Sequence, residues 1–190
     1  MSLSTTKRMA LPAVAIALLT AVGATAQDDN GAVGERVALA LASAQSAQAR
    51  SDRDELARAL GVIGRAGARP LDDWHGADPV PAWRALVPEN VSTPMRGSPL
   101  GPGYRTGQVS AGRSDSFEQV FLSGKKASIA LSTPGDTPLS LQVLDADRKP
   151  VCSTGDARRA CRWVPLFTQR YVIEVRNSGN RVADYFLVVE

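Results

Sequence analysis

This sequence of 190 residues has little of what most enzymes and metal-binding proteins need at a reaction centre. It contains one histidine and two cysteines, and it lacks the H-E-x-x-H, G-x-S-x-G and G-x-x-x-x-G-K-[ST] motifs of metalloproteases, serine hydrolases and phosphate-binding loops. The cysteine spacing fits neither a C-x-x-C redox pair nor a zinc knuckle. The sequence therefore predicts a protein that is not an enzyme and has no catalytic residue, metal ligand or cofactor.

A strong charge of one sign is also missing. The chain has 22 basic and 19 acidic residues, and loss of Lys7 and Arg8 with an amino-terminal leader would leave 20 basic residues against the same 19 acidic ones. The pI of about 9.1 is therefore not a signal for nucleic-acid binding, which calls for a basic patch with recognition elements. We expect no nucleic-acid partner.

Long apolar runs are confined to the amino terminus. Lys7 and Arg8 precede the almost continuous apolar run Met9–Val22, and Ala24–Ala26 is a small-x-small cleavage site. The run is shorter than the roughly 20 residues that span a bilayer, and no second run follows. Residues 1–26 are predicted to be a signal peptide of a periplasmic or secreted bacterial protein without a transmembrane span after cleavage, and a retained anchor is the alternative.

Cys152 and Cys161 are the only cysteines of this predicted exported chain. An even number of cysteines in an oxidising compartment indicates a disulfide, which closes a short loop and stabilises the fold by about 2.5–3 kcal/mol. We expect the two cysteines to face each other across neighbouring strands, in a disulfide-linked hairpin. Trp163 would then share the face of Cys161 and pack near the bond.

Residues 27–67 are predicted to be helical, because they are rich in alanine and contain no proline. Large apolar residues recur at helical spacing on both sides of Ser43–Ser51, which has none. The pattern fits two helices with a break near Ser51, where Ser51 would be the N-cap, or one long helix with a weak middle. Its narrow apolar stripe predicts light packing on the rest of the protein or on another copy, and the helix is expected to end at Gly61, Gly64 and Gly67.

Residues 68–103 contain seven prolines, a density that excludes a regular helix or a central strand. They also carry Trp74 and Trp83, and residues 81–86 fit one short helical turn. We interpret the segment as a strap that holds its aromatic side chains in a groove or covers a sheet edge. The alternative is a loose tether that binds a partner through its tryptophans.

Residues 104–190 show apolar residues at every second position in short runs separated by turn residues. The runs at residues 127–131, 139–143 and 171–175 are the clearest, and this period of two is typical of half-buried strands. Seven or eight such runs predict a mainly β fold, an antiparallel β-sandwich of jelly-roll-like form.

The same region resembles the bacterial pre-peptidase C-terminal domain. Asp115-Ser116-Phe117 resembles the opening of that family's first strand pair, Leu139–Asp145 its central strand, Arg170–Val175 its tyrosine-bearing strand and Tyr185–Val189 its final strand. The acidic turn departs from the family, because Arg148-Lys149-Pro150 replaces its usual glycine. The resemblance implies a small β-sandwich of an exported protein, found beside secreted peptidases, with a role in export, processing or adhesion to large substrates.

A cluster of basic residues is the candidate binding site. These residues could contact an anionic polysaccharide, a lipid headgroup or an acidic protein, although solvated hairpin tips are often charged as well. They are Arg148, Lys149, Arg158, Arg159 and Arg162.

Two acidic groups offer further alternatives. His75 lies among Asp72, Asp73 and Asp78 and could be a base or a metal ligand, although a single histidine in a strap is more often solvated. Asp136, Asp145 and Asp147 could hold calcium, but polar turn residues are the favoured interpretation because Arg148 and Lys149 oppose a dication.

The sequence favours an exported, non-enzymatic β-sandwich protein that binds a protein or an envelope polysaccharide. An accessory module of a secreted peptidase or other hydrolase is one alternative. A small enzyme that uses His75 and its neighbouring carboxylates is another.

Overall fold

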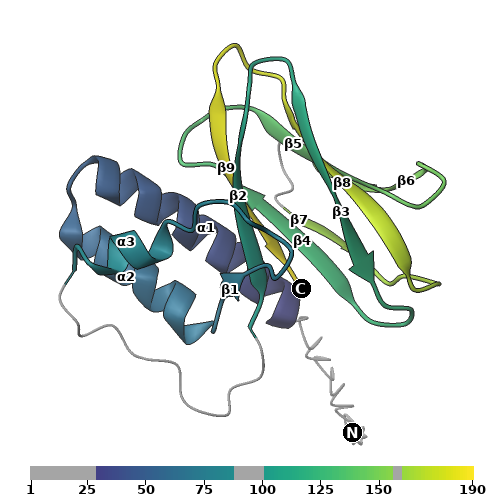
Figure 1. Ribbon diagram of the computed structural model, residues 1–190, viewed down its shortest axis with the longest axis horizontal. Coiled ribbons are helices and arrows are strands. Elements are labelled where there is room, and N and C mark those ends of the chain that lie inside the picture. The colour runs from purple at the N-terminus through teal and green to yellow at the C-terminus, as the bar shows by residue number, and fades with distance from the viewer. Residues whose placement is uncertain (1–28, 88–100, 156–159) are drawn as a thin grey trace, which may run out of the picture.

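Helices and two sheets stack as three layers in the computed structural model, which describes residues 29–87, 101–155 and 160–190 (Figure 1). The helices are α1 (Asp29–Ala49), α2 (Arg53–Arg65) and α3 (Val80–Arg84). Sheet A contains, in spatial order, β1 (Arg69–Pro70), β2 (Gly103–Val109), β9 (Ala183–Val189), β4 (Ala127–Ser132) and β7 (Ala160–Trp163). Sheet B contains, in spatial order, β3 (Ser114–Phe121), β8 (Gln169–Asn177), β5 (Leu139–Leu144) and β6 (Pro150–Ser153).

The predicted β-sandwich is confirmed. Strands β2 to β9 pair antiparallel within their sheets, and the two-residue β1 joins β2 in parallel. The inward faces follow the period of two, since Ile129, Leu141, Val143 and Ile173 are fully buried between the sheets. The alternation in the sequence therefore identified the core between the two sheets.

The outer face of sheet A is buried as well, beneath the helices. Ala130, Phe186 and Val188 point away from the sandwich and join a second core with Leu41 of α1 and Leu60 of α2. Every residue of β4 is buried as a result, and the expectations of half-buried strands and lightly packed helices were wrong for this layer. Much of the face of α1 that contacts the sheet is alanine. The sequence pattern was judged by its large apolar side chains, so it underestimated this contact.

The helical region is two helices, which settles the open choice between one and two. Ser51 adopts a positive φ of 57° in the break, and the N-cap is Asp52, whose carboxylate accepts a hydrogen bond from the backbone N–H of Glu55. The expected Ser51 cap is therefore displaced by one residue. Gly64 lies inside α2, and Gly67, at a φ of 63°, follows its end.

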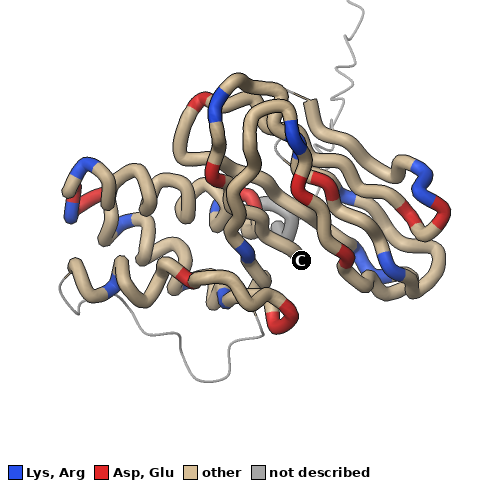
Figure 2. Tube along the Cα trace, turned by 45° about the horizontal axis from the view of Figure 1, so that its top comes forward, with Lys and Arg blue, Asp and Glu red and all other residues tan. Residues whose placement is uncertain are grey.

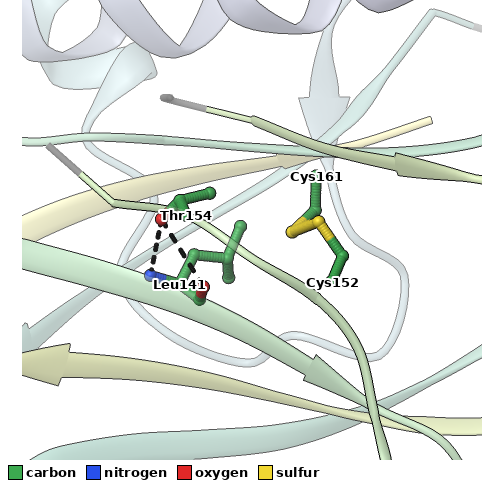
Figure 3. The surroundings of a disulfide bond; sticks show 4 residues. All are labelled: Leu141, Cys152, Thr154 and Cys161. Carbon is green, nitrogen blue, oxygen red and sulfur yellow. Dashed lines mark hydrogen bonds between the residues drawn. A yellow bond between two sulfur atoms is a disulfide. The ribbon is translucent and has the colours of Figure 1, made fainter. Parts of the chain in front are cut away.

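The predicted disulfide joins Cys152 to Cys161, with Cα atoms 5.8 Å apart (Figure 3). The bond does not lie within a hairpin, because Cys152 is in β6 of sheet B and Cys161 in β7 of sheet A. It ties together the edge strands of the two sheets. Beside it, Thr154 accepts a hydrogen bond from the backbone N–H of Leu141 at 2.9 Å, so the segment after β6 is also held to β5.

Candidate functional site

The chain between α2 and β2 runs along the edge of sheet A. Its first part, β1, pairs with β2, and the N–H of Leu71 donates to the carbonyl of Tyr104 at 2.8 Å. Farther along, Trp83 of α3 is only 5% exposed and packs against Phe186, with ring centroids 6.0 Å apart. Residues 69–87 thus cover a sheet edge and bury one tryptophan, whereas residues 88–100 of the predicted strap lie outside the described residues.

This segment, α1 and sheet A together line an open groove of about 490 Å³. Its lining comes from four segments that are far apart in sequence: the end of α1, the strap, β2 and β9. Figure 1 shows where these elements lie. The lining residues are Gln45, Gln48, Trp74, Gly76, Ala77, Pro79, Trp83, Thr106, Gly107, Gln108, Asp184, Tyr185 and Phe186.

A carboxylate held by two amides forms the polar wall of the groove. Gln45 of α1 donates to Oδ2 of Asp184 at 2.7 Å, and Gln108 of β2 donates to Oδ1 of the same side chain at 2.9 Å. This bridge fixes three side chains across the junction of the helical layer and sheet A. Gln48 is exposed beside them, so amide donors and acceptors are concentrated on this wall.

Trp74 provides the accessible aromatic surface. Its indole rests on Gly76, since a Cβ at that position would come within 2.5 Å of three indole atoms. The backbone N–H of Trp74 donates to the carbonyl of Leu71 at 3.1 Å, which holds the turn in place. Trp74 remains partly exposed, in contrast to Trp83, and it is therefore the ring that a ligand entering the groove would meet.

Asp78 anchors the strap below the groove. Its Oδ1 accepts a hydrogen bond from the hydroxyl of Tyr104 at 2.8 Å and another from the N–H of Val80 at 3.1 Å. Burial raises the pKa of the Tyr104 phenol, and the hydrogen bond to Asp78 raises it further. The phenol therefore stays neutral and acts as a donor that ties the strap to β2.

The acidic residues near His75 do not converge on it. Asp78 accepts a hydrogen bond from Tyr104, Asp72 forms an ion pair with Arg69 at 2.9 Å, and His75 is exposed. Within the described ranges, no group of three histidine, cysteine, aspartate or glutamate side chains is placed to hold a metal ion.

The proposed calcium ligands include a turn-forming residue. Asp145 accepts hydrogen bonds from the N–H groups of Asp147, at 2.9 Å, and Lys149, at 2.8 Å, between β5 and β6. Asp136 lies in another loop, between β4 and β5. The hydrogen bonds of Asp145 are those of a polar turn residue, which agrees with the favoured interpretation.

Arg148 and Lys149 lie in the turn between β5 and β6 of sheet B, whereas Arg162 lies in β7 of sheet A. Arg148 contacts Glu174 of β8 at 3.6 Å and Lys149 contacts Asp147 at 3.9 Å, whereas Arg162 of β7 pairs with Glu35 of α1. Figure 2 shows basic and acidic positions interspersed along the chain trace. Arg158 and Arg159 lie outside the described residues, so a joint basic site remains a prediction.

The groove contains residues that the sequence did not point to. Trp74 and Trp83 stood out as isolated aromatics, but Gln45, Gln108 and Asp184 belong to no motif and meet only through the packing of α1 on sheet A. The one local signal was the polar stretch of α1 that holds Gln45 and Gln48, which lacks large apolar side chains.

None of the helices in the described ranges has the length and hydrophobicity needed to cross a bilayer. The predicted signal peptide lies outside those ranges. The prediction of export rests on the leader pattern in the sequence, and the Cys152–Cys161 disulfide is compatible with it.

Comparison with known proteins finds similarity only among solved structures. No family model matches the chain, and no curated protein matches it. A pre-peptidase C-terminal domain of collagenase from Bacillus anthracis is similar over 47% of this chain and 89% of its own, with 13% identity and a TM-score of 0.42. PliG from Aeromonas hydrophila, a periplasmic inhibitor of g-type lysozyme, is similar over 47% and 84%, with 11% identity and a TM-score of 0.41.

A mitogen from Yersinia pseudotuberculosis is similar to the same extent, over 47% of this chain and 84% of its own, with 10% identity and a TM-score of 0.42. The β-sandwich that the sequence resemblance implies is the architecture of sheets A and B themselves. Similarity this distant carries no information about function.

Proposed function

We propose that this is an exported, non-catalytic binding protein whose groove holds a segment of a neutral polysaccharide. The observation that carries the proposal is that Trp74 and the Gln45–Asp184–Gln108 bridge line the same groove. Export is supported by the leader pattern of residues 1–26 and by the disulfide, which belongs to an oxidising compartment.

The chemistry of the groove matches that of a sugar ring. A pyranose presents an apolar C–H face, which packs on an aromatic ring, and hydroxyl groups that both donate and accept hydrogen bonds. Trp74 offers the aromatic surface, and the amides of Gln48 and Gln108 offer donors and acceptors. Because the walls are fixed by the Asp184 bridge, little conformational entropy is lost on binding.

The charge of the groove favours a neutral or N-acetylated sugar over an acidic one. Among the described residues that line it, Asp184 carries a negative charge and no lysine or arginine is present to balance an anionic polymer. A polysaccharide rich in carboxylates or phosphates would meet repulsion from Asp184 and no compensating cation.

The same lining argues for binding without turnover. Glycoside hydrolysis uses a pair of carboxyl groups on either side of the scissile bond. The described lining supplies one carboxylate, and both of its oxygens accept hydrogen bonds from glutamine amides. A sugar held here would find hydrogen-bonding partners but no acid–base pair.

Binding of neutral glucose- and N-acetylglucosamine-based polysaccharides and oligosaccharides would test the proposal, by co-sedimentation and calorimetry. Trp74→Ala is expected to weaken binding about tenfold or more, because aromatic anchors dominate such contacts. Gln48→Ala is expected to weaken it less, by about one hydrogen bond. His75→Ala is the matched control, because His75 is an exposed neighbour of Trp74 outside the groove lining.

Three results would contradict the proposal. They are the absence of binding to every glycan in the panel, equal loss of binding in the Trp74→Ala and His75→Ala variants, and release of shortened oligosaccharides during incubation. The last result would show that the protein is a hydrolase.

A further inference from the structure

One end of the sandwich exposes large apolar side chains that belong to neither core. The turn between β3 and β4 contributes Leu122, which is 57% exposed, and the loop between β7 and β8 contributes Val164, Leu166 and Phe167, which are 52%, 81% and 70% exposed. We call these four residues the apolar tip. Side chains of this size gathered in water usually mark a surface that contacts a partner.

Hydrogen bonds between the two segments hold the tip in one shape. The N–H of Gly124 donates to the carbonyl of Pro165 at 2.9 Å, and Ser123 donates through its hydroxyl to the carbonyl of Leu166 at 2.7 Å. The N–H of Ser123 also donates to the hydroxyl of Thr168 at 3.0 Å. The exposed Leu166 and Phe167 are therefore carried on a loop that is fixed on both sides.

An aromatic cluster directly beneath the tip adds rigidity. Phe121 of β3, Trp163 of β7 and Tyr171 of β8 contact one another with ring centroids 4.8 to 5.7 Å apart. Each of these residues lies within a few positions of the tip in sequence, and together they join both sheets at this end. A rigid apolar projection loses little conformational entropy when it enters another phase or partner.

The two segments that form the tip carry basic residues but no acidic ones. Residues 120–126 and 163–170 contain Lys125, Lys126 and Arg170 and no acidic residue. Arg170 is paired with Glu118 at 3.1 Å, and Lys125 and Lys126 are exposed on the turn that carries Leu122. The projecting apolar side chains are thus bordered by basic ones.

From this arrangement we propose that the apolar tip inserts into the surface of an anionic lipid bilayer. Leu166 and Phe167 enter the boundary between headgroups and acyl chains, and Lys125 and Lys126 contact the negatively charged headgroups. A bilayer is the occupant that fits, because it accepts a convex apolar projection without a complementary pocket and its charge complements the basic border.

The tip and the groove lie on different parts of the molecule. The groove is formed by α1, the strap, β2 and β9, whereas the tip is formed by the β3–β4 turn and the β7–β8 loop (Figure 1). Insertion of the tip therefore leaves the groove open. The protein can rest on a membrane while it holds a polysaccharide, and either property can fail without the other.

Vesicle co-sedimentation tests the proposal, with vesicles of equal parts phosphatidylglycerol and phosphatidylcholine and with vesicles of phosphatidylcholine alone. The full chain without its predicted leader is expected to bind the anionic vesicles and to release them as salt is raised. The Leu166→Ser/Phe167→Ser variant is expected to bind at least about tenfold more weakly. A Lys125→Gln/Lys126→Gln variant is expected to bind more weakly and to lose part of the salt dependence.

The matched control is a Leu39→Ser/Val182→Ser variant, which removes two exposed apolar side chains elsewhere, 44% and 55% exposed, and is expected to bind as the unaltered protein does. Thermal melts of all variants check that they fold. The proposal is overturned if anionic vesicles are not bound at low salt, or if the tip and control variants bind them equally. It is also overturned if the tip substitutions abolish self-association or binding to another protein while vesicle binding is absent.

Discussion

Two buried tyrosines each donate their phenol proton to a carboxylate: Tyr104 to Asp78 and Tyr185 to Asp115. Burial is the main cause that raises the pKa of each phenol, followed by the hydrogen bond to the carboxylate. The first bond ties the strap to sheet A, and the second ties β9 to β3 across the sandwich. Each bond thus links two segments that are distant in sequence.

This arrangement predicts a loss of stability in alkali. Below the unfolded-state pKa of about 10 the tyrosines are protonated in both states, and above it the unfolded chain releases protons that the folded protein retains. The free energy of unfolding should therefore fall as pH rises above about 10. Urea denaturation between pH 8 and pH 11 should show a shallower fall for Tyr104→Phe, and equal slopes for variant and unaltered protein would contradict the assignment.

Asn177 is a buried polar side chain whose hydrogen bonds all go to backbone groups. It is fully buried, donates to the carbonyls of Val109 and Arg181 at 3.0 and 2.7 Å, and accepts from the N–H of Gly179 at 2.8 Å. Asn177→Ala is expected to lower the free energy of unfolding by about 1–3 kcal/mol or more, because it leaves buried backbone groups unpaired.

The comparison for Asn177 is Ser178→Ala, which removes one exposed hydrogen bond to the carbonyl of Pro138. Its effect should be about 0.5 kcal/mol or less. Equal midpoints of urea denaturation for the two variants would show that the Asn177 bonds contribute little.

At the scale of elements, the disulfide matters because of where it lies. The edges of sheets A and B that carry β7 and β6 have no further strand beside them in the described part of the chain, and Cys152–Cys161 joins them. The loop-closure model gives about 2.5–3 kcal/mol for a loop of this length. Reduction, or a Cys152→Ser/Cys161→Ser variant, should lower the Tm by several degrees in a thermal melt.

Mass spectrometry of protein from its native compartment should find the cysteines without free thiols. Two free thiols there, or an unchanged Tm after reduction, would show that the bond does not stabilise the fold in its native setting.

The elements also show what the sequence could and could not predict. Inward-facing residues such as Ile129, Val143 and Ile173 alternate with outward ones, so their strands and faces were visible in the pattern. The covering of the outer face by α1 was not visible, because the contact is made by small residues such as Ala44 and Ala130. Their short side chains allow close approach of helix and strand while contributing almost nothing to an apolar stripe.

The position of the disulfide illustrates the same limit. The cysteine count and the compartment predicted the bond between Cys152 and Cys161. Whether the two strands share a sheet depends on how the chain crosses between layers after Thr154, and spacing alone does not specify that crossing.

At the scale of the whole molecule, the candidate site exists only where the layers meet. Gln45 comes from the helices, Trp74 from the strap, and Gln108 and Asp184 from sheet A. No contiguous motif could encode such a site, because residues separated by more than a hundred positions must be brought together by packing. From the sequence, only Trp74 and Trp83 of the proline-rich segment could be recognised as candidate members of this site.

The same three-layer body keeps the groove and the apolar tip apart. The helices and strap form one side of the groove, and the tip closes the sandwich at an end made of β3, β4, β7 and β8 (Figure 1). This separation fits a protein that holds a polysaccharide close to a membrane, and it allows the two proposed contacts to be measured one at a time.

Hydrogen exchange measured with and without a saturating neutral polysaccharide tests the role of the groove most directly. Bound ligand should slow exchange in the strap around Trp74, at the end of α1 around Gln48 and in β2 around Gln108, and leave the β5–β6 turn unchanged. The Trp74→Ala variant should lose this protection, and the His75→Ala variant should keep it. Protection centred on the β5–β6 turn, or none at the groove, would contradict a polysaccharide site there.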